Sequence, residues 1–232
     1  MRRNLDGSMK VFHYDKSFDG LLSAIFDAYT DRVFPEALLG PGDAPPLLVT
    51  REHTVITRAD KAGRVFAGLE KRLSRPARTG LMLAWMSEQV GSDLLLFRYI
   101  RKVFDSSRPI ECDYADGDVF GVRQLAERVA AEQHLMLGFA RFQKTADGLY
   151  FAALSPKYNV LPLLLPHFAD RFGDQRWILY DAARSYGILF DGKDFQDIVL
   201  NPDSLHEGRL RDALLAEDEL LFQSLWQEYF KA

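Results

Sequence analysis

The protein has 232 residues, of which 47% are hydrophobic and 27% are charged, and its formal net charge is -4. A chain of this length and balance can bury a hydrophobic core without disulfides or structural metal ions. Its single cysteine, Cys112, excludes an intramolecular disulfide and any metal site built from several thiolates, and it favours a reducing, cytoplasmic location.

Hydropathy gives no sign of a membrane segment. No run of about 18 apolar residues occurs, and the first ten residues lack the apolar stretch of a signal peptide. We therefore expect no contact with a membrane. Residues 1–8 are interpreted as a leader or added segment, and residues 9–232 as the folded part.

Charge is distributed unevenly along the chain. Residues 51–109 contain 12 Lys and Arg against 6 Asp and Glu, whereas residues 187–232 contain 4 basic and 10 acidic side chains. Because a local basic face can attract phosphate groups, the acidic total does not exclude a nucleic-acid partner.

The N-terminal half is predicted to be mainly helical, with two short strands. The strands are expected at 11–14 and around 53–57, and a helix from Ser17 is expected to end before Pro35. Helical periodicity predicts four further helices, at 61–75, about 80–90, 93–104 and 118–133.

The predicted helix 61–75 combines an apolar face with a neighbouring basic face. The basic side chains are Lys61, Arg64, Lys71, Arg72 and Arg75. They could bind phosphates or simply form a solvated surface, and the sequence leaves both interpretations open.

After His134 the hydrophobic period changes from 3.6 to 2. Residues 134–143 and 149–154 flank an Asp147-Gly148 turn, which predicts a β-hairpin. A helix is expected at 159–172, strands are expected at 177–180, 186–190 and 195–200, and the tail from Ser204 is expected to be helical. The predicted fold class is α+β, with a helical N-terminal half carrying short strands and a C-terminal antiparallel ββαβββ sheet covered by a helix.

We expect residues 9–232 to form a single α+β domain. A subdivision into a mainly helical part, 9–133, and a part with the sheet and the C-terminal helix, 134–232, stays open because no long linker separates them.

The sequence contains none of the common catalytic signatures, such as GxxxxGK[ST], GxGxxG after a strand, GxSxG or HExxH. Its five histidines lack metal-ligand spacing, so we expect neither a metal ion nor a cofactor. If the chain is an enzyme, the candidate catalytic residues are His134, His167 and Asp181. A lone histidine is more often a packed or capping side chain, and we expect the isolated chain to turn over no nucleic-acid substrate.

Arginines and aromatic residues are interleaved in the C-terminal half. The basic candidates for nucleic-acid binding are Arg141, Lys144, Arg171, Arg176 and Arg184. The aromatic residues that could stack on bases beside them are Phe139, Phe142, Tyr158 and Trp177. Strand alternation alone favours a core position for these rings.

Several short motifs occur in an order and spacing that resemble one bacterial protein family. They are Tyr14-Asp-Lys-Ser-Phe-Asp-Gly-Leu-Leu-Ser23, His53-Thr-Val, His134-Leu-Met-Leu-Gly-Phe-Ala-Arg-Phe142, the Leu161-Pro to Arg171-Phe segment and Trp177-Ile-Leu-Tyr-Asp-Ala-Ala-Arg184. The family is associated with DNA metabolism or repair, has no known biochemical activity, and is encoded beside a radical SAM protein also proposed to act in DNA repair. Some relatives resemble fusions to a uracil-DNA glycosylase-like domain.

The resemblance implies an accessory role in DNA metabolism or repair, through binding of DNA, of the radical SAM partner, or of both. It supplies no catalytic residue. Two alternatives stay open, namely an enzyme that processes DNA lesions with dispersed polar residues such as His134, Arg141 and His167, and a protein-interaction scaffold without DNA contact. The family pattern usually continues beyond Tyr229 into a Lys/Arg-rich segment, where this sequence stops.

Overall fold

A computed structural model describes residues 9–200, 205–206, 209–210 and 215–216. The chain divides into two compact units, residues 1–129 and residues 130–232. The helix α5 (Gly117–Phe139) contains the point of division. Each unit has its own hydrophobic core.

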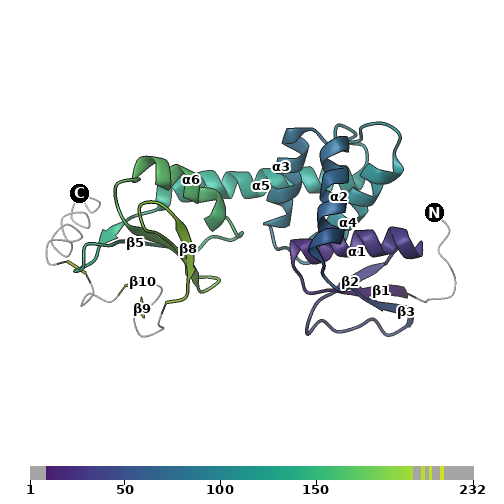
Figure 1. Ribbon diagram of the computed structural model, residues 1–232, viewed down its shortest axis with the longest axis horizontal. Coiled ribbons are helices and arrows are strands. Elements are labelled where there is room, and N and C mark those ends of the chain that lie inside the picture. Colours follow the sequence, from purple (N-terminus) through teal and green to yellow (C-terminus); the bar gives the residue numbers. More distant parts are fainter. Residues whose placement is uncertain (1–8, 201–204, 207–208, 211–214, 217–232) are drawn as a thin grey trace. The chain divides into compact units, whose positions relative to one another are not determined.

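The first unit contains a small parallel sheet (Figure 1). Its strands are β1 (Met9–His13), β2 (Ala37–Leu39) and β3 (Val49–Thr54), with β1 in the middle and both neighbours parallel to it. The strands predicted at 11–14 and 53–57 are confirmed with shifted ends. Strand β2 was not predicted, because three residues are too few to show a period.

Four helices accompany this sheet before α5 begins. They are α1 (Phe18–Asp31), α2 (Ala59–Arg72), α3 (Arg75–Trp85) and α4 (Ser92–Asp105). Ser17 caps α1 by accepting the Gly20 N–H, as expected for a serine at this position. The apolar faces of the helices and the β1 residue Phe12 form one continuous core.

The basic helix predicted at 61–75 is two helices. Helix α2 ends at Arg72, and Ser74 caps α3 by accepting the Ala77 N–H, with Pro76 in the first turn. A serine followed by a proline two positions later is a strong start signal. Arg75 therefore belongs to α3, not to the helix that carries the other four cations.

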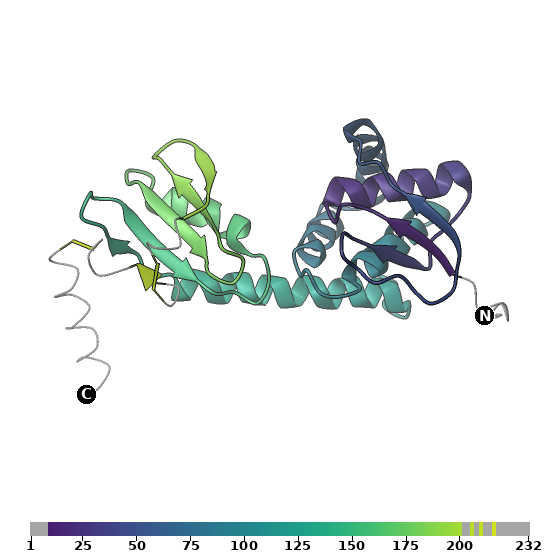
Figure 2. The ribbon, with the colours of Figure 1, turned by 90° about the horizontal axis from the view of Figure 1, so that it is seen from below.

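The second unit is built on a five-stranded sheet in the order β4-β5-β6-β7-β8. The strands are β4 (Gln143–Lys144), β5 (Tyr150–Leu154), β6 (Trp177–Asp181), β7 (Tyr186–Phe190) and β8 (Phe195–Ile198). Helix α6 (Leu161–Arg171) covers one face (Figure 1 and Figure 2). Side chains alternate between the faces, so Trp177 and Leu179 pack with α6 while Ile178 and Tyr180 lie on the opposite face.

The structure confirms the α+β class and corrects two features of the predicted sheet. Residues 134–139 are not a strand, because α5 continues to Phe139. Met136, Leu137 and Ala140 pack on the core while Leu135 and Phe139 are exposed, and this spacing is helical. The side-chain alternation inferred from the sequence at 134–139 is too short to distinguish a strand from a helix.

The second correction concerns strand direction. The Asp147-Gly148 turn joins β4 and β5 in an antiparallel pair, and Gly148 has a φ of +79°. However, β5 and β6 are parallel, because α6 returns the chain to the end of the sheet where β5 began. Only the pairs β4-β5, β6-β7 and β7-β8 are antiparallel.

The tail differs from the prediction where it is described. Residues Leu205–His206 and Arg209–Leu210 form a two-stranded antiparallel pair, β9 and β10, and not the expected helix. The remaining part of the predicted tail helix lies outside the described residues.

Candidate nucleic-acid interface

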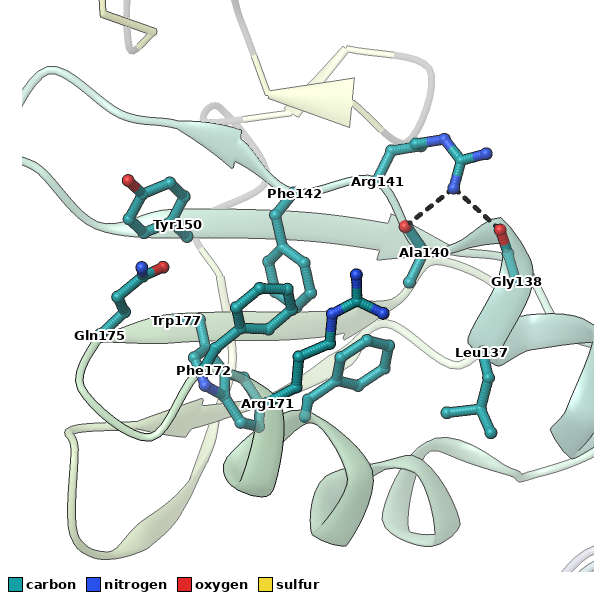
Figure 3. A pocket seen from close by; sticks show the side chains of 11 residues that line it. Leu137, Gly138, Ala140, Arg141, Phe142, Tyr150, Arg171, Phe172, Gln175 and Trp177 are labelled. Atoms are coloured by element: carbon teal, nitrogen blue, oxygen red, sulfur yellow. Dashed lines mark hydrogen bonds between the residues drawn. The ribbon is translucent and has the colours of Figure 1, made fainter.

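A pocket of about 470 Å³ opens in the second unit beside α6 (Figure 3). Its wall is assembled from the end of α5, the segment leading to β4, strand β5, helix α6 with the residues after it, and the start of β6. The lining residues are Leu137, Gly138, Ala140, Arg141, Phe142, Tyr150, Phe168, Arg171, Phe172, Gln175 and Trp177. The volume lies within the range of small-ligand sites.

Aromatic rings form most of the apolar wall. The Phe142 ring meets the rings of Phe168, Phe172 and Trp177 edge-on, at centroid distances of 5.2, 5.4 and 6.0 Å. Phe168 and Trp177 are buried, whereas Phe142 and Phe172 are half-buried. Interlocked rings are stiff, so the pocket is largely preformed.

Two guanidinium groups supply the charge of the pocket. Arg141 donates from Nη1 to the carbonyl oxygens of Gly138, at 2.8 Å, and Ala140, at 3.3 Å, which fixes it at the end of α5. Arg171 lies over the Phe172 ring with its guanidinium carbon 5.4 Å from the ring centroid. The described residues of the lining include no carboxylate, so this wall favours a ligand that is both anionic and apolar or aromatic.

Two uncharged polar side chains lie together at another part of the rim. Figure 3 shows both residues at the same edge of the pocket, with the Gln175 amide directed toward the aromatic rings and the Tyr150 hydroxyl directed away from them. An amide offers donors and an acceptor and a hydroxyl offers one of each, which suits a ligand with a mixed polar edge.

The structure brings together part of the predicted C-terminal set. Arg141, Arg171, Phe142 and Trp177 all line the pocket. The remaining candidates, Phe139, Lys144, Tyr158, Arg176 and Arg184, do not line it. Sequence reasoning missed four pocket residues, namely Phe168, Phe172, Tyr150 and Gln175. The one available signal was helical spacing, which places Arg171 and Phe172 three and four positions after Phe168.

At the end of β6 the buried Asp181 forms an ion pair with Arg184, which is half-buried. The Asp181 carboxylate accepts from Arg184 Nη1 at 3.0 Å and from the backbone N–H groups of Ala183 and Arg184. Arg184 also donates to the carbonyl oxygens of Pro156 and Lys157. Both carboxylate oxygens are therefore engaged in holding the β6-β7 turn.

The candidate histidines lie on helices and are exposed. His134 belongs to α5 and His167 to α6, where its ring contacts the neighbouring Phe168 ring edge-on at 5.2 Å. Neither lines the pocket, and neither forms a hydrogen bond or ion pair with Asp181. The three candidate catalytic residues are therefore not gathered around this cavity.

In the first unit, two of the predicted cations of α2 are engaged with protein groups. Lys61 Nζ donates to Asp27 at 2.6 Å, and Arg72 Nη1 donates to the carbonyl oxygens of Val103 and Ser106. Arg64 lies over the Phe26 ring at 4.9 Å and is exposed. Lys71 and Arg75 are also exposed.

Two polar clusters in the first unit had no signal in the sequence. In one, Asp27 accepts from both Lys61 and His53 Nε2, the latter at 2.9 Å. In the other, Asp93 accepts from the Tyr14 hydroxyl at 2.9 Å and from Lys16 Nζ at 2.7 Å. Burial, with the Asp93 charge and hydrogen bond, raises the pKa of Tyr14 far above its ordinary value.

Within the described residues, no group of three or more His, Cys, Asp and Glu side chains is arranged to hold a metal ion. No helix in the described part of the chain is long and apolar enough to cross a membrane.

The chain is thus a two-unit α+β protein whose second unit carries an aromatic pocket with two arginines. Residues 91–232 match the family described as a domain of unknown function, DUF4130, and the protein belongs to this family. The match includes the whole second unit. No curated protein matches the sequence.

Proposed function

We propose that the protein is an accessory protein of DNA metabolism or repair that binds DNA, a radical SAM partner, or both. The observation that supports DNA binding is the lining of the pocket, where two arginines and several aromatic rings meet and none of the described lining residues carries a carboxylate. Arginine is suited to phosphate because its planar fork pairs with two oxygens, and aromatic rings stack on any base. The place of action would then be the bacterial cytoplasm, where DNA lies.

The exposed cations of the first unit extend this proposal. Arg64, Lys71 and Arg75 are exposed on the first unit and are suited to neutralise phosphates there, independently of the pocket of the second unit. Such contacts add affinity without reading the sequence, since phosphates are the same at every step.

The test of DNA binding is a titration of labelled single-stranded and duplex oligonucleotides, followed by fluorescence anisotropy at several salt concentrations. We expect affinity to fall as salt rises, and the slope to become smaller by about one for each phosphate contact removed. Arg141→Ala with Arg171→Ala should weaken binding, whereas Lys193→Ala, which removes an exposed charge outside the pocket, should leave it unchanged. Equal effects of the pocket and control variants would contradict the proposal for this site.

The partner half of the proposal needs its own experiment. The radical SAM protein suggested by the family resemblance would be co-expressed with this chain, and the complex isolated with and without DNA. Recovery only in the presence of DNA would show that DNA bridges the two proteins. Recovery in neither condition would exclude a direct partnership.

A further inference from the structure

We infer that the pocket of the second unit receives the base of one unpaired deoxynucleotide within a DNA strand. This inference deepens the proposed function and rests on it. It assigns the base to the aromatic wall, its polar edge to Tyr150 and Gln175, and its phosphate to Arg171.

The aromatic wall supports an unstacked base rather than a base pair. Of the four rings that line the cavity of about 470 Å³, Phe168 and Trp177 are buried, and only Phe142 and Phe172 expose ring surface to it. A ligand reaches these two rings only by entering the cavity. A base inside a duplex has its faces covered by its neighbours, and only its edges are accessible in the grooves. A base that is unpaired or extruded can present its face to the rings.

The charge distribution supports a nucleotide rather than an uncharged aromatic ligand. Among the described residues, the Arg171 guanidinium makes no hydrogen bond or ion pair, and it lies over the Phe172 ring. Its donors are therefore available to a phosphate beside a base on that ring. Arg141 has one nitrogen engaged with backbone carbonyls and retains further donors in its guanidinium.

The polar rim supports recognition of the base edge. Neither the Tyr150 hydroxyl nor the Gln175 amide has a hydrogen-bond partner among the described side chains and backbone groups. Figure 3 shows both residues at the same edge of the pocket, with the Gln175 amide directed toward the aromatic rings and the Tyr150 hydroxyl directed away from them. Base edges carry adjacent donors and acceptors, which an amide can pair with two at a time. These two residues therefore set any preference among bases.

The experiment uses duplexes that carry the fluorescent base 2-aminopurine either paired or as a single unpaired bulge. The full-length protein should bind the bulged duplex at least fivefold more tightly and should change 2-aminopurine emission only in the bulge, because stacking quenches it. Phe172→Leu keeps an apolar side chain but removes the ring, and should lower affinity for the bulge roughly tenfold, the scale of one base–aromatic stack.

Further variants change polar side chains of the pocket, so that weaker binding can be distinguished from a loss of folding. Arg171→Ala should weaken binding to bulged DNA, and Gln175→Ala with Tyr150→Phe should reduce differences among the four bases at the bulge. Lys193→Ala is the matched control and should behave like the original protein. Free deoxynucleoside monophosphates that compete as well as the bulged strand would overturn the assignment to DNA and indicate a free nucleotide.

The outcomes separate this inference from the proposed function. Tight DNA binding that is equal for paired and bulged duplexes, and unchanged by the pocket variants, would overturn the inference and leave DNA binding intact. Absence of binding to every oligonucleotide would overturn both.

Discussion

Lys61 and Asp27 form a close ion pair between α2 and α1, with the Lys61 Nζ 2.6 Å from an oxygen of Asp27. The side chains of Asp27 and Lys61 are 10% and 19% exposed. A cation held in this way supports the packing of the two helices and has little freedom to reach a phosphate.

Replacing Lys61 with methionine should therefore affect stability more than DNA binding. We expect a loss of about 1–3 kcal/mol, because a mostly buried carboxylate loses its charged donor. Urea unfolding measures this loss. Lys71→Met, which changes an exposed lysine of the same helix, should change stability by less than about 0.5 kcal/mol. A larger effect of Lys61→Met on DNA affinity than on stability would contradict this assignment.

Asp181→Asn should destabilise the second unit. Asp181 is fully buried and accepts from Arg184, so asparagine in its place weakens a charge-assisted hydrogen bond at a buried site. Because the Arg184 side chain is 20% exposed and keeps its backbone acceptors, we expect a loss of about 1–3 kcal/mol. Asp197→Asn, in the exposed strand β8, serves as the control in the same unfolding experiment. If Asp181 were instead a catalytic group, its replacement would leave the unfolding midpoint near that of the control.

Alkaline pH should weaken the first unit through Tyr99. Burial, with a contribution from the Glu111 charge, raises the pKa of Tyr99 to about 12, whereas an unfolded tyrosine titrates near 10. Between these values the unfolded chain loses a proton that the folded chain keeps, so stability is complete below about pH 10 and falls as the pH rises toward 12.

The slope expected from this one group is about 1.4 kcal/mol per pH unit. Urea midpoints measured for the original protein and for Tyr99→Phe should run in parallel below about pH 9 and separate above about pH 10, where the variant loses less stability. Parallel curves up to pH 11 would show that Tyr99 does not carry this effect.

Two glycine-to-alanine substitutions, one near the end of α5 and one in the turn between β4 and β5, should have opposite effects on stability. A Cβ on Gly138 meets no atom within 4 Å, and the residue is inside the helix, so Gly138→Ala should stabilise by about 0.5–1 kcal/mol. Gly148 has a φ of +79°, so Gly148→Ala should destabilise by about 1 kcal/mol. Thermal unfolding should give a higher midpoint for Gly138→Ala and a lower midpoint for Gly148→Ala than for the original protein. Destabilisation by Gly138→Ala would argue against a helix at this position.

The sequence predicted the elements whose side-chain period extends over several turns or a complete strand. The apolar positions Val65 and Leu69 of α2 and the alternation of Trp177 to Tyr180 in β6 lie where expected. Residues 134–139 were assigned wrongly because six residues fit both periods, and only the position of the core decides between them. Strand direction also depends on where α6 packs, which short-range patterns do not encode.

The sequence predicted only part of the candidate site. Arg141, Arg171, Phe142 and Trp177 were singled out as an interleaved basic and aromatic set, and all four line the pocket. Gln175 and Tyr150 also line the pocket, because the chain returns from α6 into β6 and β6 pairs with β5. This pairing brings together residues that are distant in the sequence. The pairing of Asp27 with His53 and Lys61 likewise spans 26 and 34 positions, beyond the reach of a local motif.

The parallel pairing of β5 with β6 also gives an order for the folding of the second unit. Strands β6, β7 and β8 are joined by short turns, so their contacts are local and can form early. Strand β5 reaches β6 only after residues 155–176, including α6, have closed a much longer loop. Because the pocket needs β5, α6 and β6 together, it is among the last parts of the unit to be completed. A nascent or partly unfolded chain would then contain the three-stranded meander before it could hold a ligand.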